Sequence, residues 1–189
     1  MKKVFWVLLL LLLLCGCEKH GPEYLVSSIG FDKVNESYKV CFESVIINSE
    51  DTKQTVKLLK GEGQTIKVAI GQIEKQCTQP LLLSHCGVLA IGDGIAENEL
   101  KDIAKYCING KEITLSAFLI KTENAEKLLS VKPLSSLAVG FDIMGLLEQN
   151  KTYKNRLFEV VNVDYNTTLP SITINDGGLI LVENRRMLH

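Results

Sequence analysis

The spacing of apolar residues changes along this chain from every second position to a helical repeat, and this change most constrains the fold. Between residues 37 and 47, Tyr38, Val40 and Phe42 share one face, and a period of two predicts a β-strand. After residue 65 the spacing becomes i, i+3, i+4, i+7, i+11, which is one apolar face of an α-helix. The residues with this spacing are Ile66, Ala69, Ile70, Ile73 and Cys77. The chain therefore combines strands and helices within a short length.

The same reasoning assigns an order of elements up to residue 132. Strands are expected at 24–32, 37–47, 81–91 and 112–121, and helices at 66–77, 100–108 and 124–131. The short connector 33–36 predicts a hairpin, and part of segment 48–60 is a possible further strand. Gly110 is expected just past the end of the second helix, where a positive φ is easily adopted. The order predicts an α+β fold: a mixed β-sheet with an opening hairpin and β-α-β crossovers, and helices packed on the sheet.

A boundary between domains is expected after Lys132, where Pro133 follows. Beyond it the pattern predicts less regular helices and two strands, at 134–149, 152–161, 171–175 and 179–183. This tail is short for an independent core. We therefore expect one domain at 17–132 and an incomplete second domain at 133–189. The alternative is that the tail packs onto the first sheet as part of a single domain.

The N-terminus has the pattern of an export signal. Lys2 and Lys3 precede an apolar run, and polar residues follow it, as in a secretory signal peptide. The stretch Leu14-Cys15-Gly16-Cys17 resembles a bacterial lipobox, so residues 1–16 are expected to be removed and Cys17 to be lipidated. Cys15 fits this role poorly because Leu14 would precede it. An uncleaved membrane helix is the alternative, but it needs about 20 apolar residues, and the run is shorter.

The charge balance excludes one broad class of function. The chain has 21 basic and 22 acidic residues, for a net charge of −1, and no long run of one sign. Nucleic-acid-binding proteins normally carry a clustered basic face, so no nucleic-acid partner is expected.

Four cysteines follow Cys17, and each lies in an apolar segment: Cys41, Cys77, Cys86 and Cys107. An exported chain can oxidise them, but free cysteine is often a small buried hydrophobic residue. Reduced thiols in the core are therefore favoured. The spacing is not that of a zinc site, so no metal is expected.

Three motifs that could carry chemistry are better explained by structure. Gly61-Glu62-Gly63 lacks the third glycine of a dinucleotide-binding loop and is expected to set the entry of the helix. His85 has Ser84 and Cys86 as neighbours, but neighbours along a strand point to opposite faces. No catalytic residue is therefore expected, and His85 is interpreted as structural or as facing a partner. Asn166-Thr167-Thr168 matches a glycosylation sequon and is interpreted as a loop.

Several segments, in order, resemble the C subunits of bacterial spore germinant receptors, a family of germination lipoproteins. They begin with the lipobox at Cys17, and the family pattern continues to the last pair of expected strands. The other matching segments are Ile29-Gly30-Phe31-Asp32, Gly61-Glu62-Gly63-Gln64-Thr65, His85 with Val88-Leu89-Ala90-Ile91-Gly92, and Leu169-Pro170-Ser171-Ile172.

The resemblance implies a role in nutrient-triggered germination and no enzymatic activity. It implies a position on the outer face of the spore inner membrane, beside integral-membrane A and B subunits and anchored by membrane lipid. No cofactor is expected apart from the covalent diacylglycerol or fatty acyl group on Cys17. Two other classes remain as alternatives: an extracytoplasmic solute-binding lipoprotein, and a hydrolase, for which no convincing acid, base or metal set is present.

Overall fold

The computed structural model describes residues 23–47, 54–110, 113–134, 136–150, 155–162, 168–175 and 178–182. Within these ranges the strands form one mixed sheet in the order β3-β2-β1-β5-β6-β7-β8, with β4 beside β1. The strands are β1 (Glu23–Val34), β2 (Ser37–Ile47), β3 (Thr55–Gly63), β4 (Leu81–Leu82), β5 (Val88–Gly92), β6 (Phe118–Thr122), β7 (Ser171–Asn175) and β8 (Gly178–Val182). The helices are α2 (Ile66–Glu74), the 3₁₀ helix η1 (Leu83–His85), α3 (Glu97–Gly110), α4 (Ala125–Leu129), α5 (Val139–Gln149) and α6 (Leu157–Asn162).

The opening hairpin that the sequence predicted is confirmed. β1 and β2 pair along their whole length, from Glu23 opposite Ile47 to Val34 opposite Ser37. The two residues between them, Asn35 and Glu36, have φ of 49° and 64°. Positive φ at both positions is the requirement of the type I′ turn, whose twist matches that of the strands. β3 adds an antiparallel strand to the outer edge of β2.

The remainder of the sheet is mostly parallel, as the predicted crossovers require. β5 pairs with β1, β6 with β5 and β7 with β6, all in parallel, and β8 closes the far edge antiparallel to β7. The α+β fold with a mixed sheet is therefore confirmed.

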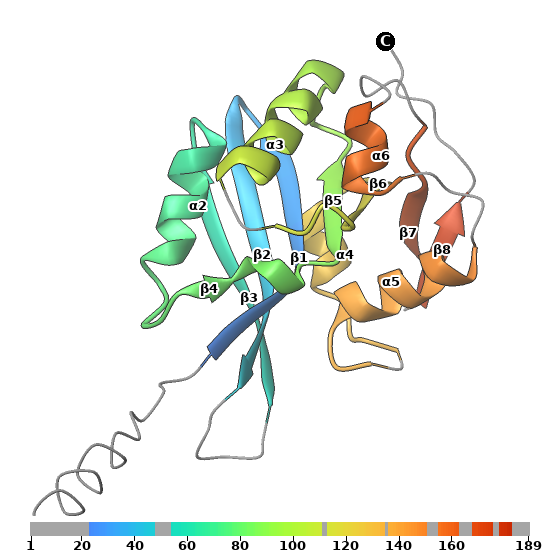
Figure 1. The fold of residues 1–189 in the computed structure, drawn as a ribbon, viewed down its shortest axis with the longest axis horizontal. Helices are drawn as coiled ribbons and strands as arrows, with labels where there is room; N and C mark the ends of the chain where they lie inside the picture. The colour runs from blue at the N-terminus through green and yellow to red at the C-terminus, as the bar shows by residue number, and fades with distance from the viewer. Residues whose placement is uncertain are drawn as a thin grey trace, which may run out of the picture.

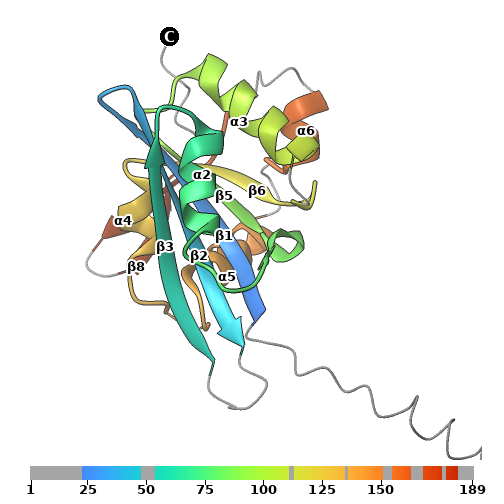
Figure 2. The same ribbon diagram turned by 90° about the vertical axis from the view of Figure 1, so that its left-hand side faces the viewer.

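Helices cover both faces of this sheet (Figure 1). On one face α2, α3 and α6 bury a large apolar cluster, and on the other α4 and α5 bury a second one. Figure 2 shows α4 on one side of the strands and α3 and α6 on the other. Completely buried side chains of the first cluster include Ile29, Phe31, Phe42, Ile73 and Leu89, and those of the second include Ile120, Leu128 and Ile143.

The strand expected at 81–91 is interrupted, which corrects the sequence prediction. Leu82 pairs with Leu25 and Val88 with Ser28, so the segment has more residues than β1 offers as partners. The surplus residues leave the sheet as η1. A β-bulge in β1 lies at the same place, between Val26 and Ser28.

The strand expected at 112–121 is shorter than predicted, because β6 begins only at Phe118. Its partner β5 begins at Val88. The residues before Phe118 instead form a turn in which the Ala117 N–H binds the Thr114 carbonyl.

Three glycines also differ from the sequence prediction. Gly110 is the last residue of α3 and does not adopt a left-handed conformation. Gly61 and Gly63 lie in β3 instead of opening α2.

Residues after Lys132 join the same sheet as the residues before it. The Lys121 N–H binds the carbonyl of Pro170 at 2.8 Å, and β7 follows beside β6. This packing corresponds to the alternative considered from the sequence, in which the tail belongs to the first sheet. The extent of any second domain stays a prediction.

Candidate functional site

Cys17, the expected lipid-attachment residue, lies outside the described residues, as does the expected signal peptide at 1–16. The first described strand, β1, begins at Glu23, a few residues after Cys17. The end of β2 and the start of β3 lie level with the start of β1, because Ile47 pairs with Glu23 and Ile46 with Thr55. We call this end of the strands the edge where β1 begins. This edge is at the bottom of Figure 1, and a chain that arrives from Cys17 enters the fold there.

A buried carboxylate fastens α5 to the sheet. Glu43 of β2 is only 2% exposed. Its Oε1 accepts the N–H of Val139 at 2.6 Å, and its Oε2 accepts the N–H of Gly140 at 2.8 Å. The hydroxyls of Ser27 and Ser28 donate to the same Oε2 at 2.7 and 2.9 Å. The first N–H groups of a helix lack intrahelical partners and carry partial positive charge, so this carboxylate stabilises the start of α5.

The bulge in β1 makes the contact with both serines possible. Consecutive side chains on a regular strand point to opposite faces, but Ser27 is the unpaired residue of the bulge between Val26 and Ser28. An extra residue re-aims the side chains next to it. Ser27 and Ser28 can therefore both reach Glu43.

A second buried carboxylate, Asp32 of β1, holds α4 in the same manner. Its two oxygens accept the N–H groups of Ala125 and Glu126, each at 2.9 Å. Asn124 completes the cap, since its Oδ1 accepts the N–H of Lys127 at 2.6 Å. Asp32 of β1 and Glu43 of β2 thus position α4 and α5 relative to the β1–β2 hairpin.

Within the stretch Ile29-Gly30-Phe31-Asp32, Gly30 and Asp32 face α4, whereas Ile29 and Phe31 belong to the apolar cluster on the other face of the sheet. A Cβ on Gly30 would lie 2.6 Å from the sulfur of Cys41 and 2.9 Å from the Cβ of Ala125, so a larger residue would push the helix away. Gly92 of β5 lies against Asp32, and a Cβ on Gly92 would collide with the carboxylate of Asp32. Two segments of the family resemblance therefore meet at one place in the fold.

Gly61-Glu62-Gly63 has a related role and forms no phosphate loop. A Cβ on Gly61 would collide with the carbonyl oxygen of Ala69 in α2, so the glycine allows the helix to approach the strand. Thr65 caps α2 by accepting the N–H of Val68 at 3.3 Å. The stretch therefore positions α2 from within β3, and not as the loop before the helix that the sequence predicted.

His85 lies in η1 and not in a strand, so the prediction that strand geometry separates its side chain from those of Ser84 and Cys86 is wrong. Ser84 and His85 are both exposed, and Cys86 is completely buried. Cys86 is excluded from any exposed site by that burial. Among the described residues, no three His, Cys, Asp or Glu side chains gather as a metal site.

The four cysteines of the described chain are free. Burial raises the pKa of the Cys41 and Cys86 thiols strongly, and it raises that of Cys107 to about 12. Cys77 is half-buried, and burial together with nearby Glu74 raises its pKa as well. The expected place in the core is confirmed for the three buried residues.

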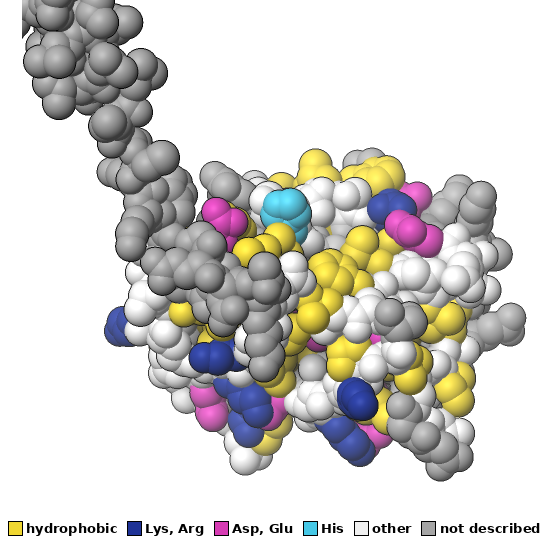
Figure 3. All heavy atoms as spheres, turned by 90° about the horizontal axis from the view of Figure 1, so that it is seen from below, with side chains coloured by type: hydrophobic (Ala, Val, Ile, Leu, Met, Phe, Trp, Pro, Cys, Tyr) yellow, Lys and Arg dark blue, Asp and Glu magenta, His cyan; other side chains and the backbone are white. Residues whose placement is uncertain are grey.

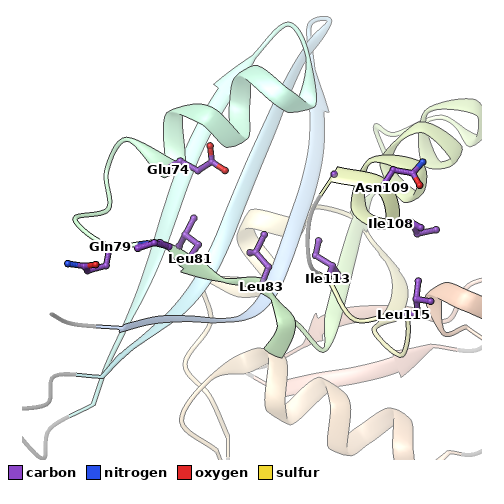
Figure 4. A pocket seen from close by; sticks show the side chains of 10 residues that line it. Glu74, Gln79, Leu81, Leu83, Ile108, Asn109, Ile113 and Leu115 are labelled. Carbon is purple, nitrogen blue, oxygen red and sulfur yellow. The ribbon is translucent and has the colours of Figure 1, made fainter. Parts of the chain in front are cut away.

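A cleft of about 940 Å³ lies between the ends of α2 and α3. Leu81, Leu83 and Ile113 form an apolar lining, and Glu74, Gln79 and Asn109 supply polar groups (Figure 4). The last residue of α2 and the last three of α3 border it. Helix C-termini carry partial negative charge, so two such helix ends border a mostly apolar cleft.

Residues 23–174 match the family described as the spore germination protein N-terminal domain. The chain belongs to this family. The match confirms the resemblance to germinant-receptor C subunits found in the sequence, and it gives the chain a role in spore germination. No curated protein and no solved structure matches the chain significantly. Within the described residues, no helix is long and apolar enough to cross a membrane.

The residue that sequence reasoning missed in this spore germination domain is Glu43. The alternation of β2 placed Glu43 on one face with Cys41 and Val45, and a carboxylate between two apolar neighbours on a strand face was a detectable signal. Its partners could not be identified from the sequence, because the start of α5 is distant in the chain.

Proposed function

We propose that the chain is a lipid-anchored, non-catalytic subunit of a receptor through which spores detect nutrients. In this proposal Cys17 becomes the mature N-terminus and carries a diacylglycerol or fatty acyl group. The domain then stands on the outer face of the spore inner membrane beside the integral-membrane A and B subunits.

The observation that carries the proposal is the family match over residues 23–174. The start of β1 at Glu23 agrees with it, since a short tether from Cys17 reaches one edge of the sheet. A non-catalytic role is supported by the positions of the buried polar and thiol groups. Asp32 and Glu43, the two buried carboxylates described above, bind helix N-termini, and Cys86 is buried with a raised pKa.

Replacement of Cys17 in spores tests this proposal. The Cys17→Ala variant should leave the inner membrane and lose the germination response to its nutrient. Cys15→Ala is the matched control. It makes the same change two positions before Cys17 and keeps a small residue there, so this protein should still be lipidated at Cys17. A Cys17→Ala protein that stays in the membrane with an unchanged mass, in spores that germinate normally, would contradict the proposal.

The cleft between α2 and α3 favours a second candidate, an extracytoplasmic lipoprotein that binds a small solute. Binding sites for small molecules are commonly apolar hollows with a few polar groups, and this cleft has that composition. Isolation of the native protein with a bound metabolite would support the second candidate. A metabolite-free protein that co-purifies with membrane subunits would favour the first.

A further inference from the structure

The loop between α4 and α5 carries the most exposed large apolar side chain of the described residues. Leu134 is 61% exposed, and Leu137, in the same loop, is 38% exposed. Single exposed leucines are normal on protein surfaces. Here the two lie close together in one short segment, and exposed Lys132 lies beside them.

Hydrogen bonds hold this loop in place at both ends. The N–H of Leu134 binds Oδ2 of Asp142 at 2.6 Å. At the other end the N–H groups of Val139 and Gly140 bind the buried carboxylate of Glu43. Hydrogen bonds therefore hold the backbone at Leu134 and at the start of α5, and both leucines are exposed.

Partly exposed apolar residues of α5 extend the surface around Leu134. Leu134, Phe141, Leu146 and Leu179 line a shallow hollow of about 240 Å³. Figure 3 views the molecule from the edge where β1 begins, and hydrophobic side chains gather across the centre of that face. We call Leu134, Leu137, Phe141 and Leu146 the apolar face.

The register of the sheet places this loop at the edge where β1 begins. Val45 pairs with both Leu25 and Val56, so Val56 lies level with the first residues of β1. Leu137 and Val56 line the same hollow of about 410 Å³. The loop therefore packs near the start of β1 and not near the hairpin turn at the other end.

The chain that precedes β1 limits what can lie opposite the apolar face. From Cys17 to Glu23 an extended chain spans at most about 20 Å. β1 itself is about 35–40 Å long at about 3.3 Å per residue. An acyl group on Cys17 thus keeps the start of β1 within about 20 Å of the bilayer, whereas the hairpin turn can lie farther from it.

We infer that Leu134 and Leu137 insert into the interfacial region of the lipid bilayer, with Lys132 directed at anionic headgroups. Apolar side chains flanked by lysine are the composition of segments that lie in a membrane interface. The contact would fix the orientation of the domain on the membrane. This inference rests on the proposed anchor at Cys17 and adds a second membrane-binding site to it.

Tryptophan fluorescence tests the inference directly, because the single tryptophan of the chain, Trp6, lies in the expected signal peptide. Leu134→Trp or Leu137→Trp then supplies the only tryptophan of the processed chain. The lipidated full-length protein is placed on vesicles of phosphatidylglycerol and phosphatidylcholine whose acyl chains carry bromine, a quencher. Val34→Trp is the control, since Val34 is 43% exposed at the far end of β1.

Bromine should reduce the emission of Leu134→Trp and Leu137→Trp at least twofold and leave Val34→Trp unchanged. Mass spectrometry of the same samples reports whether Cys17 is acylated. If the Leu134→Trp and Leu137→Trp proteins are lipidated and vesicle-bound but not quenched, the inference is overturned and the anchor stays intact; such a face would then contact protein. A chain without lipid at Cys17 overturns both the proposed anchor and the bilayer contact of the leucines, because the distance to the bilayer was derived from an acyl group on Cys17.

Discussion

The carboxylate of Glu43 accepts the backbone N–H of Val139 at 2.6 Å across a sequence separation of 96 residues. The first strands of the sheet and the segment after Lys132 are joined by this contact. The spore germination domain therefore depends on a buried polar contact as well as on its apolar core.

Replacing Glu43 should destabilise the fold. In Glu43→Gln the amide nitrogen must face a backbone N–H of α5, and each buried donor left without an acceptor costs about 1–3 kcal/mol. We expect the free energy of unfolding, measured with urea, to fall by about 3 kcal/mol. Glu62→Gln on exposed β3 is the matched control and should change it by less than about 0.5 kcal/mol. Equal effects of the two substitutions would show that Glu43 does not hold α5.

Two glycines should respond in opposite directions to the same substitution. Gly30→Ala puts a Cβ 2.6 Å from the sulfur of Cys41, and overpacking of this kind costs about 1–3 kcal/mol. Gly71→Ala in α2 meets nothing within 4 Å and should stabilise the protein by about 0.5–1 kcal/mol, because alanine favours the helix. Thermal unfolding of both variants measures this. A stabilised Gly30→Ala would contradict the close approach of α4.

The elements of this fold differ in how much the sequence reveals. The hairpin and the helical periods depend on neighbouring residues, so their positions could be predicted. The break between Leu82 and Val88 could not, because it follows from the number of residues that β1 offers as partners. The late start of β6 has the same origin, since β5 determines where pairing begins.

The polar contacts between distant segments are harder still to predict from the sequence. Asp32 lies in a segment that the sequence singled out. Its function as the acceptor for α4 nevertheless depends on Ala125 and Glu126, which are 93 and 94 positions farther along the chain. The apolar face was not predicted either, because Leu134 and Leu137 fit the helix that the pattern favoured at 134–149. Ala138 precedes α5 in an extended conformation, so these leucines are in a loop.

The cysteines should differ in their reactivity toward an alkylating reagent. The thiolate is the reactive form, and burial raises the pKa of Cys41, Cys86 and Cys107. In the native protein iodoacetamide should therefore modify half-buried Cys77 first, and the other three only after unfolding. Peptide mass spectrometry at successive times identifies the order. Early modification of Cys86 would contradict its burial.

Stability should depend on pH through Glu99 of α3. Burial alone would raise the pKa of Glu99, but hydrogen bonds from Lys33, the Ala96 N–H and Tyr38 lower it below its ordinary value of 4.5. The same pairing with Glu99 raises the pKa of Lys33 above 10.5. A lowered carboxyl pKa stabilises the fold above the unfolded value and loses that effect as pH falls through the folded value.

Comparison with Glu99→Gln isolates this contribution. Between about pH 5 and 10 the wild-type protein should unfold at higher urea than the variant. The difference should shrink as the pH falls below about 4.5, where Glu99 of the unfolded chain becomes protonated, and again above about pH 11, where unfolded Lys33 is neutral. A difference that stays constant down to about pH 2 would exclude Glu99 as its cause.

Isolation of the protein from spore membranes tests the receptor assignment most directly. A tag at the C-terminus leaves Cys17 free for processing, and mild detergent releases the complex from the inner membrane. We expect both integral-membrane subunits, A and B, to be recovered together with a chain that begins at acylated Cys17. Recovery of an unacylated chain that still carries residues 1–16, alone and from the cytosol, would contradict it.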